Sequence, residues 1–361
     1  MTPRALLIIT LLLVAYEFLQ GNMQGADGLL ETGVGLLRDT LPILRETGTS
    51  RRPSRIAADD EMREMDHILP YLSVMSGYTG FCNSQHRLYE RPISFPDEDP
   101  PLPGSTSPTR LLSAWGRFYT RAIIFHVQAT RALFGRASGD LGKTQEEQER
   151  CLELLRRWRE VVMDCRDRFV SSRDARTRRA MRLVHMQYLT ILIAVSCCRD
   201  KTDMLYDRYE AEFREMLRLC SECLAEPEPV SKIRFTFEGG SIASPLFIIL
   251  CKCRRRDLRM KAVAACQKVS WREGAWDGKA LLCGLGLAML EEQYRDESGH
   301  IPASARFVWK DVKWDQQHRQ LVAEYWKLRP EKDGTIVSRQ LTLDVDRWTT
   351  EAFGDTGEQT S

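Results

Sequence analysis

The sequence predicts a mainly α-helical fold, a multi-helical bundle made of αα-hairpins, with a small β element near the C-terminus. Three observations lead to this prediction. Apolar residues recur at helical spacing through successive segments of the chain, which is the pattern of amphipathic helices. Prolines, glycines and capping residues separate these segments. After Pro302 the pattern changes to short alternating and β-branched runs, which indicate strands.

The composition is that of a folded globular protein without a strong charge bias. The chain has 361 residues, of which 43% are apolar and 28% charged, and this excludes wholesale disorder. Its 52 basic and 50 acidic residues leave a net charge of +2, whereas a domain that binds phosphates by itself usually has a basic excess. The 11 cysteines lie mostly in apolar helical stretches, and this usage suits a reducing compartment.

The hydrophobic start allows two interpretations. Residues 5–15 read ALLIITLLLVA behind Arg4, which is typical of a secretory signal. The run is too short to span a bilayer, which takes about 20 apolar residues, and no small-residue cleavage site follows it. Alternatively, these residues form a buried helix that ends at Gly21-Asn22. Apolar residues at helical spacing over 26–37 favour the second interpretation, an αα-hairpin whose first helix is covered on most sides by later helices.

Further helices are predicted along the middle of the chain. Residues 46–60 are polar and basic and are predicted to form a surface loop. A short helix over 66–75 is predicted to be interrupted at Pro70, and the proline-rich residues 92–108 to form an extended loop. Four amphipathic helices follow, over 109–134, 144–170, 175–198 and 203–224. The third is apolar nearly all round in its second half and is predicted to lie at the centre of the bundle.

Capping residues and a turn signal organise the C-terminal third. Three shorter helices are predicted to begin at Ser244-Pro245, with Ser as N-cap and Pro in the first helical position, at Asp257 and at Asp277. Strands are predicted over 306–312 and 335–345, with Asp333-Gly334 as a tight turn before the second. We therefore predict one domain over residues 1–345 and a frayed tail over 346–361.

The sequence offers no catalytic, metal-binding or cofactor-binding residue to assign. The CxxC at residues 220–223 and the CxC at 251–253 have no histidines at zinc-finger spacing and lie in amphipathic helices, so we interpret them as core cysteines. Signature motifs of serine hydrolases, zinc proteases and phosphate-binding loops are missing from the sequence. His126 and His185 fall on apolar helix faces and are predicted to be core histidines with satisfied hydrogen bonds. The chain is therefore predicted not to be an enzyme.

Two basic stretches are candidates for contact with nucleic acid. One is the turn over residues 252–259, and the other is the start of the third long helix, residues 173–182. The helix after the first turn carries few polar side chains for reading base edges, so we do not predict a recognition helix there. We interpret both stretches as solvated helix ends.

Several motifs occur in a specific order along the chain. The first are Glu17-Phe18-Leu19-Gln20-Gly21-Asn22, Leu155-Arg156-Arg157-Trp158 and Tyr206-Asp207. The longest set comprises Pro245-Leu246-Phe247, Lys252-Cys253-Arg254, Arg259, Ala262, Arg272-Glu273-Gly274-Ala275-Trp276-Asp277, Glu291-Glu292, Ile301-Pro302 and Arg306. In order and spacing these motifs resemble the C-terminal effector region of fungal zinc-cluster transcription factors, the fungal-specific transcription factor domain.

The resemblance covers about residues 5–345 and implies the helical regulatory domain of a nuclear transcription regulator. The implied partners are proteins, either the transcription machinery or a full-length zinc-cluster factor, together with a small-molecule effector, and no membrane. Trp276 is expected to be a core anchor. The six-cysteine zinc cluster of the family is not found in this sequence, so we do not expect this chain alone to read DNA sequence.

Two other classes of protein remain open. One is a helical enzyme whose site the sequence does not reveal. The other is a membrane-anchored or secreted protein headed by residues 5–15. The missing catalytic motifs argue against the first, and the predicted αα-hairpin argues against the second.

Overall fold

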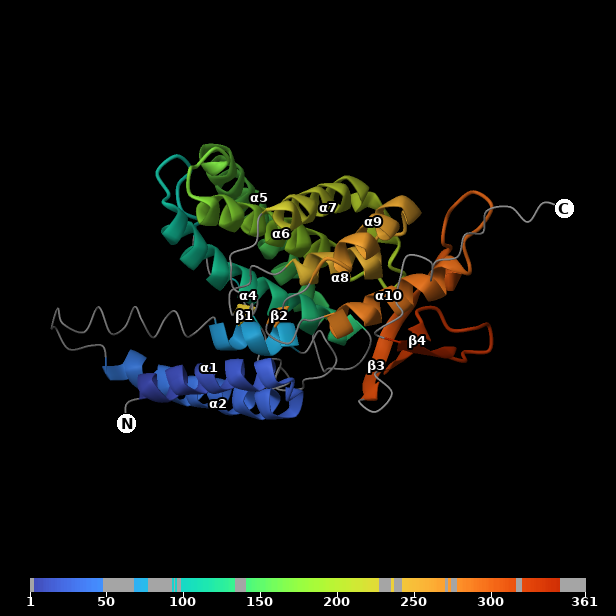
Figure 1. The fold of residues 1–361 in the computed structure, drawn as a ribbon, viewed down its shortest axis with the longest axis horizontal. Helices are drawn as coiled ribbons and strands as arrows, with labels where there is room; N and C mark the ends of the chain where they lie inside the picture. Colours follow the sequence, from blue (N-terminus) through green and yellow to red (C-terminus); the bar gives the residue numbers. More distant parts are fainter. Residues whose placement is uncertain are drawn as a thin grey trace.

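A computed structural model describes most of the chain. The described residues are 3–47, 68–76, 93, 95, 99–133, 141–226, 235–236, 242–269, 272–273, 278–315 and 320–344. The predicted loop at 46–60 (apart from its first two residues), much of the proline-rich stretch, Trp276, Asp277 and the tail over 346–361 lie outside them. Within them, the structure confirms a mainly α-helical fold with a small sheet near the C-terminus (Figure 1).

The helices of the main bundle follow the predicted order. They are α4 (Pro108–Leu133), α5 (Leu141–Phe169), α6 (Ala175–Cys197), η3 (Met204–Tyr209), α7 (Glu210–Ala225), α8 (Ala243–Lys252), α9 (Arg256–Cys266) and α10 (Gly278–Glu292). The last predicted long helix is therefore divided, since its first turn is the 3₁₀ helix η3. The side chains of Ser244 and Asp257 were expected as N-caps, but both residues lie inside the first turn of α8 and α9. The N-cap residues are instead Ile242 for α8 and Arg255 for α9, and neither makes a side-chain cap hydrogen bond.

Helix α6 lies at the centre of the bundle, as predicted. It contacts α4, α5, α7 and α8, and the side chains of its second half are almost all buried. Asp174 caps its first turn by accepting hydrogen bonds from the backbone N–H groups of Arg176 and Thr177. By length and composition, α6 is the one helix among the described residues that is apolar enough to cross a membrane, and 67% of its apolar window is buried inside the protein.

The predicted αα-hairpin at the N-terminus is present. Helices α1 (Pro3–Gln20) and α2 (Met23–Thr47) meet at Gly21, whose φ of 77° is readily adopted by glycine. The hairpin lies below the remaining helices in Figure 1. Its core contains Leu7, Leu11, Val14 and Phe18 of α1 packed on α2. Asn22 bonds both the Gly25 backbone and the Glu17 carboxylate, and so fixes the turn.

The expectation that later helices cover α1 on most sides is wrong. The face of α1 opposite α2 is exposed, and the large apolar side chains on it are Ile8, Ile9, Leu12, Leu13, Tyr16 and Leu19. The physical reason is that α1 is apolar all round, so periodicity could not tell which face is covered.

A short helix over residues 68–76 joins the hairpin to the main bundle. Leu69 and Leu72 belong to the core of the hairpin, whereas Val74 and Met75 belong to that of the bundle. The expected interruption at Pro70 is wrong, because the helix runs through it from residue 68 to residue 76. Pro70 is the third of these described residues, and proline is tolerated near the start of a helix, where a backbone N–H is not needed.

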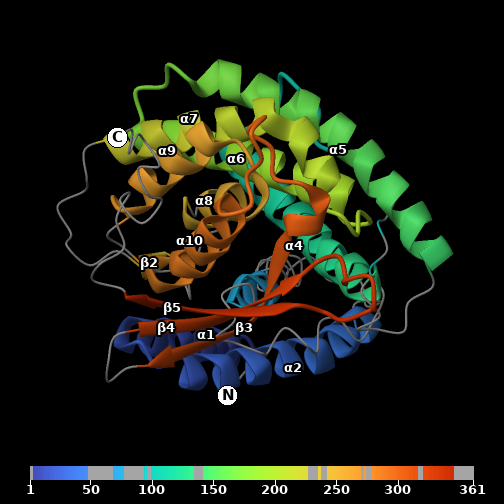
Figure 2. The ribbon, with the colours of Figure 1, turned by 90° about the vertical axis from the view of Figure 1, so that its right-hand side faces the viewer.

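The C-terminal sheet packs on α10. Strands β3 (Phe307–Asp315), β4 (Gln320–Lys327) and β5 (Ser338–Asp344) form an antiparallel sheet in that order, visible edge-on in Figure 2. The sequence predicted the outer strands and the turn at Gly334 (φ 85°) but missed β4. The sheet and α10 approach closely at Gly286, where the Tyr325 hydroxyl donates to the Cys283 carbonyl. The two-residue strands β1 (Phe235–Thr236) and β2 (Arg272–Glu273) pair in parallel elsewhere.

Candidate ligand cavity and its ion network

The turn over residues 252–259, which was predicted to be solvated, is instead buried in part. The exposed fractions of Arg254 and Arg259 are 6% and 0%. Both guanidinium groups reach the carboxylate of Glu291, which is itself fully buried at the end of α10. The prediction was wrong because the sequence of a basic turn does not tell whether its arginines face water or a buried carboxylate from another segment. Arg255 and Arg256 fit the original expectation, since both are exposed, Arg255 with 56% of its side chain accessible.

Glu291 is the central acceptor of this cluster. Its Oε1 accepts from Arg254 Nη2 at 3.0 Å and from the Phe307 backbone N–H at 3.1 Å, and its Oε2 accepts from Arg259. Burial by itself would raise the pKa of Glu291. The two facing guanidinium groups outweigh burial and hold the pKa of this carboxyl below its usual range. Glu291 is therefore a carboxylate through which α10 is joined to the turn between α8 and α9, to α9 and to β3.

The cluster continues through Asp203 to the start of η3. Asp203 Oδ2 accepts from Lys252 Nζ at 2.6 Å and from Arg254 Nη2 at 3.3 Å. Its backbone has a φ of 58°, and it is the one described residue other than glycine with a positive φ. Left-handed backbone at an aspartate carries a modest strain, which persists where the surroundings fix it. The carbonyl of Asp203 accepts from Arg306, which also pairs with Asp207.

We call this cluster the ion network. Its cations are Lys252, Arg254, Arg259, Arg295 and Arg306, and its anions are Asp203, Asp207, Glu291 and Glu292. They come from segments that are separated by as many as 103 positions in the sequence. A buried cluster of this kind is held in place by mutual pairing, because an unpaired buried charge is costly.

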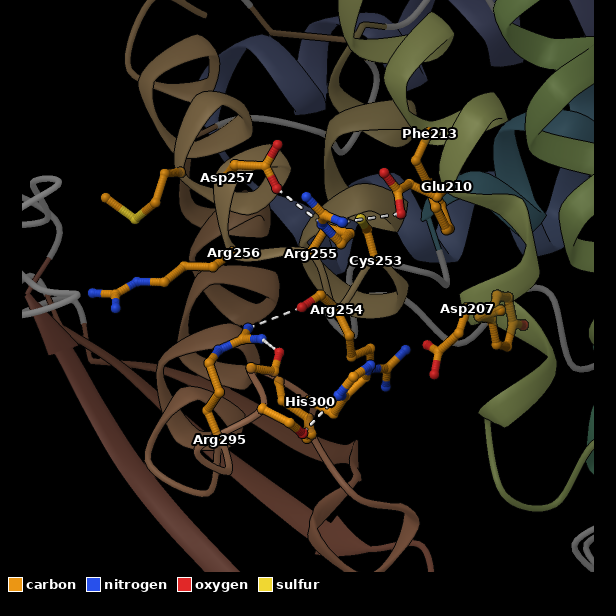
Figure 3. Close-up of a pocket in the computed structure, with 15 residues that line it drawn as sticks. Asp207, Glu210, Phe213, Cys253, Arg254, Arg255, Arg256, Asp257, Arg295 and His300 are labelled. Atoms are coloured by element: carbon orange, nitrogen blue, oxygen red, sulfur yellow. Dashed lines mark hydrogen bonds and ion pairs between the residues drawn. The ribbon is translucent and has the colours of Figure 1, made fainter.

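One side of the ion network borders a groove of about 930 Å³, whose lining includes several arginines and carboxylates (Figure 3). Figure 3 shows Arg255 between Asp257 and Glu210, to which it donates at 3.1 and 3.3 Å. Arg295 reaches across to the backbone carbonyl of Arg254 at 2.9 Å. These arginines already have protein partners, so the groove has little unpaired positive charge with which to hold a phosphate.

The second basic stretch, residues 173–182, is only partly solvated. Arg173 and Arg176 are exposed, as predicted. Arg179 donates to the Cys223 carbonyl at 2.9 Å, and Arg182 pairs with both Glu222 and Glu226 at the end of α7. Part of this basic stretch therefore fastens α6 to α7.

The other side of the ion network borders a partly open cavity of about 340 Å³ between α4, α6, α8, α10 and β3. Its walls are mainly apolar, with Ile123 from α4, Ala194 from α6, Phe247 from α8 and Trp309 from β3. Polar atoms enter it at His126, Thr190, Asp203 and Lys252. A mainly apolar cavity with a few converging polar groups is typical of a small-molecule site.

His126 lies in the cavity wall as a neutral group. Burial and, less strongly, nearby Lys252 together lower its pKa to about 4, although a backbone hydrogen bond at Ala194 and the Asp203 carboxylate act in the opposite direction. At neutral pH the imidazole therefore offers one donor and one acceptor. His126 was predicted to be a core residue, but it is half-buried and lines the cavity. His185 is elsewhere in the core, 3% exposed, with its Nδ1 3.9 Å from Glu215 Oε1 and no hydrogen-bond partner for that atom among the described residues.

The cysteines behave as small apolar residues. All ten described cysteines are buried and free of disulfides. Burial raises the pKa of Cys197, Cys198 and Cys251, whose thiols line the cavity, so they stay protonated and weakly nucleophilic. Among the residues that the structure describes, no group of three or more His, Cys, Asp or Glu side chains is placed to hold a metal ion.

Sequence reasoning missed Asp203 and Thr190, and it named Glu291 as a motif residue without assigning it a role in a site. A signal for Glu291 was present, because it falls three and four positions after Ala288 and Leu287 and so shares their buried face of α10. The sequence contains no such signal for Thr190 or Asp203. Threonines occur commonly in apolar helices and aspartates in polar loops, so neither position indicated a site.

Comparison of the sequence and structure with protein-family models, curated proteins and solved structures found no match. The function is therefore argued from the site itself.

Proposed function

We propose that this chain is a helical regulatory domain of a transcription regulator of the fungal zinc-cluster type, acting in the nucleus through protein partners and a small-molecule effector. It is an effector module, and it neither catalyses a reaction nor reads DNA sequence by itself. The cavity is its sensing site, and the ion network connects that site to α8, α9, α10 and the sheet.

The observation that carries this proposal is the convergence of the residues behind the resemblance. The motif residues Asp207, Lys252, Arg254, Arg259, Glu291, Glu292 and Arg306 are spread over four separate segments of the sequence. All seven belong to the ion network. The order and spacing of these residues bring their charges together so that they pair with one another. This pairing explains why the motif occurs although none of its residues has a catalytic role.

The pairing of basic groups supports a role other than DNA reading. Protein–DNA affinity depends on cations that can release counterions from phosphates. Arg254, Arg259 and Arg306 are buried against carboxylates, and Arg182 is fastened to α7. A random duplex library incubated with the purified chain near physiological salt tests this part. We expect no enriched sequence among the bound duplexes, and a defined enriched site would overturn it.

A tethering experiment tests the regulatory role. Residues 1–361 are fused to an unrelated DNA-binding domain and placed upstream of a reporter gene in a fungal host. We expect reporter transcription to rise or fall at least threefold relative to the DNA-binding domain alone. An unchanged reporter, with the fusion present in the nucleus at equal abundance, would contradict the proposal.

The exposed apolar face of α1 favours a second candidate, a secreted or membrane-anchored protein headed by residues 5–15. Leu12 and Tyr16 are 62% and 56% exposed on that face. Exposed apolar surface of this extent marks contact with another surface. Cleavage of the expressed protein near residue 20, with the remainder in the medium, would support this candidate over the first.

A further inference from the structure

The cavity extends along the second half of α6. Thr190, Ala194 and Cys197 line it in succession, and seven residues of helix rise about 10 Å. Ile123 and Phe247 form apolar walls on the neighbouring helices. This shape admits a slender apolar molecule that lies along α6, with one end near Thr190 and the other near Lys252.

Lys252 supplies a cation at one end. Its ammonium group has three N–H donors, and among the described residues its one hydrogen-bonded acceptor is Asp203, at 2.6 Å. The ammonium also lies 4.9 Å from the centre of the Tyr206 ring, which fixes its direction. Two donors are therefore left for an acceptor that enters from the cavity.

The groups around Lys252 decide how an anion would be held there. Asp200 also lines the cavity, and its carboxylate accepts from the backbone N–H of Leu205 and from Thr202 and interacts with Arg306. With Asp200 counted, the five cations of the ion network face five carboxylates. A bound carboxylate is therefore held by direct hydrogen bonds from the free N–H donors of Lys252 and not by an excess of positive charge.

Thr190 supplies a hydroxyl at the other end. Its side chain is 5% exposed, and its Oγ1 has no hydrogen-bond partner among the described residues. A buried hydroxyl without a partner is costly, and a ligand group that pairs with it removes that cost. The complementary group is a hydroxyl or carbonyl on the ligand.

We propose that the cavity binds a slender apolar monocarboxylate that carries a hydroxyl or carbonyl group at its far end. The carboxylate is held by Lys252, the apolar body lies along α6, and the far polar group pairs with Thr190. As an effector site it rests on the function proposed above, but as a binding site it is tested without any transcription readout.

Calorimetric titration of the full chain with three probes tests the assignment. The probes are ω-hydroxyoctanoate, octanoate and the octane diol with a hydroxyl at each end. We expect ω-hydroxyoctanoate to bind tightest, octanoate about fivefold more weakly, since it has no group for Thr190, and the diol at least tenfold more weakly, since it has no charge for Lys252. Equal binding of the three probes, or no binding of any, would overturn the proposal.

Two variants assign each end of the ligand to its residue. Thr190→Val should remove the difference between ω-hydroxyoctanoate and octanoate. Because it also removes an unpaired buried hydroxyl, the unliganded variant should be at least as stable as the parent. Lys252→Met should remove the difference between ω-hydroxyoctanoate and the diol. The matched controls are Thr32→Val on α2 and the exposed Lys261→Met on α9, and both should keep the full order of affinities.

A third variant guards against misfolding at Lys252. Ala194→Phe fills the cavity from α6 and should abolish binding of all three probes while the circular dichroism spectrum stays unchanged. Retained affinity in a folded Ala194→Phe protein would place the ligand elsewhere and overturn the proposal. The tethered reporter tests the regulatory function independently of ligand binding. An unchanged reporter with intact probe binding would reject the regulatory function but not the binding site. A responding reporter without probe binding would reject the binding site alone.

Discussion

Replacement of Glu291 by glutamine is the sharpest test of the ion network. The substitution keeps the size of the side chain and removes its charge. In the parent, the fully buried carboxylate accepts from Arg254, Arg259 and the Phe307 backbone N–H. In the variant, the neutral amide leaves these cations short of one anion and turns an N–H₂ donor toward a guanidinium group, which is itself only a donor.

The expected loss follows from the partners that remain. Removing one member of a buried ion pair typically costs about 3–5 kcal/mol. Arg254 keeps Asp203 at 3.3 Å, and Arg259 keeps Glu292 at 3.2 Å. Because both cations keep a second carboxylate, we place the loss near the lower end, at about 3 kcal/mol of the free energy of unfolding.

Urea denaturation followed by circular dichroism measures this loss. The control is Glu297→Gln, at an exposed position in the loop after α10. A surface change of this kind should alter the free energy of unfolding by no more than about 0.5 kcal/mol. Combining Glu291→Gln with Arg259→Met should give a double variant whose loss is smaller than the sum of the two single losses, because they remove the same pair. A loss below about 1 kcal/mol for Glu291→Gln would refute the buried network as described.

Three other predictions concern the rest of the fold. Because burial lowers the pKa of His185 to about 4, the unfolded chain binds more protons between about pH 6.5 and 4, so stability falls as pH falls through that window. His185→Leu should flatten this part of a stability–pH profile, and an unchanged slope would place the histidine in water. Gly286→Ala should cost about 1–3 kcal/mol in a thermal melt, because the new methyl group collides with Tyr325, whereas Gly28→Ala meets nothing within 4 Å and should not destabilise. N-terminal sequencing of protein from a eukaryotic host should find α1 retained, since its inner face is part of the hairpin core; a new terminus near residue 20 would contradict this.

Much of the fold could be predicted from the sequence, because the pattern that indicates each helix lies within the helix itself. A period near that of the α-helix gave α4, α5 and α6 to within a few residues, and it placed α6 at the centre from its nearly continuous apolar surface. The Gly21-Asn22 turn and the Gly334 turn were predicted from residues that tolerate or prefer a positive φ. Each of these features depends on neighbours within a few positions, so the sequence alone determines it.

The tertiary structure decided what each exposed or charged residue faces. Strand β4 was missed because its partners lie on either side of it in the sheet, and pairing rather than local pattern stabilises it. The outer face of α1 was expected to be covered and is not, since an all-apolar helix carries no information about which side is packed. The arginines at 254 and 259 were expected in water, yet Glu291 and Asp203 are brought to them from α10 and from the segment before η3. The free energy of a charge depends on what surrounds it in three dimensions, so the sequence supplies the charges of this site and only the packing of the helices makes them a network beside a cavity.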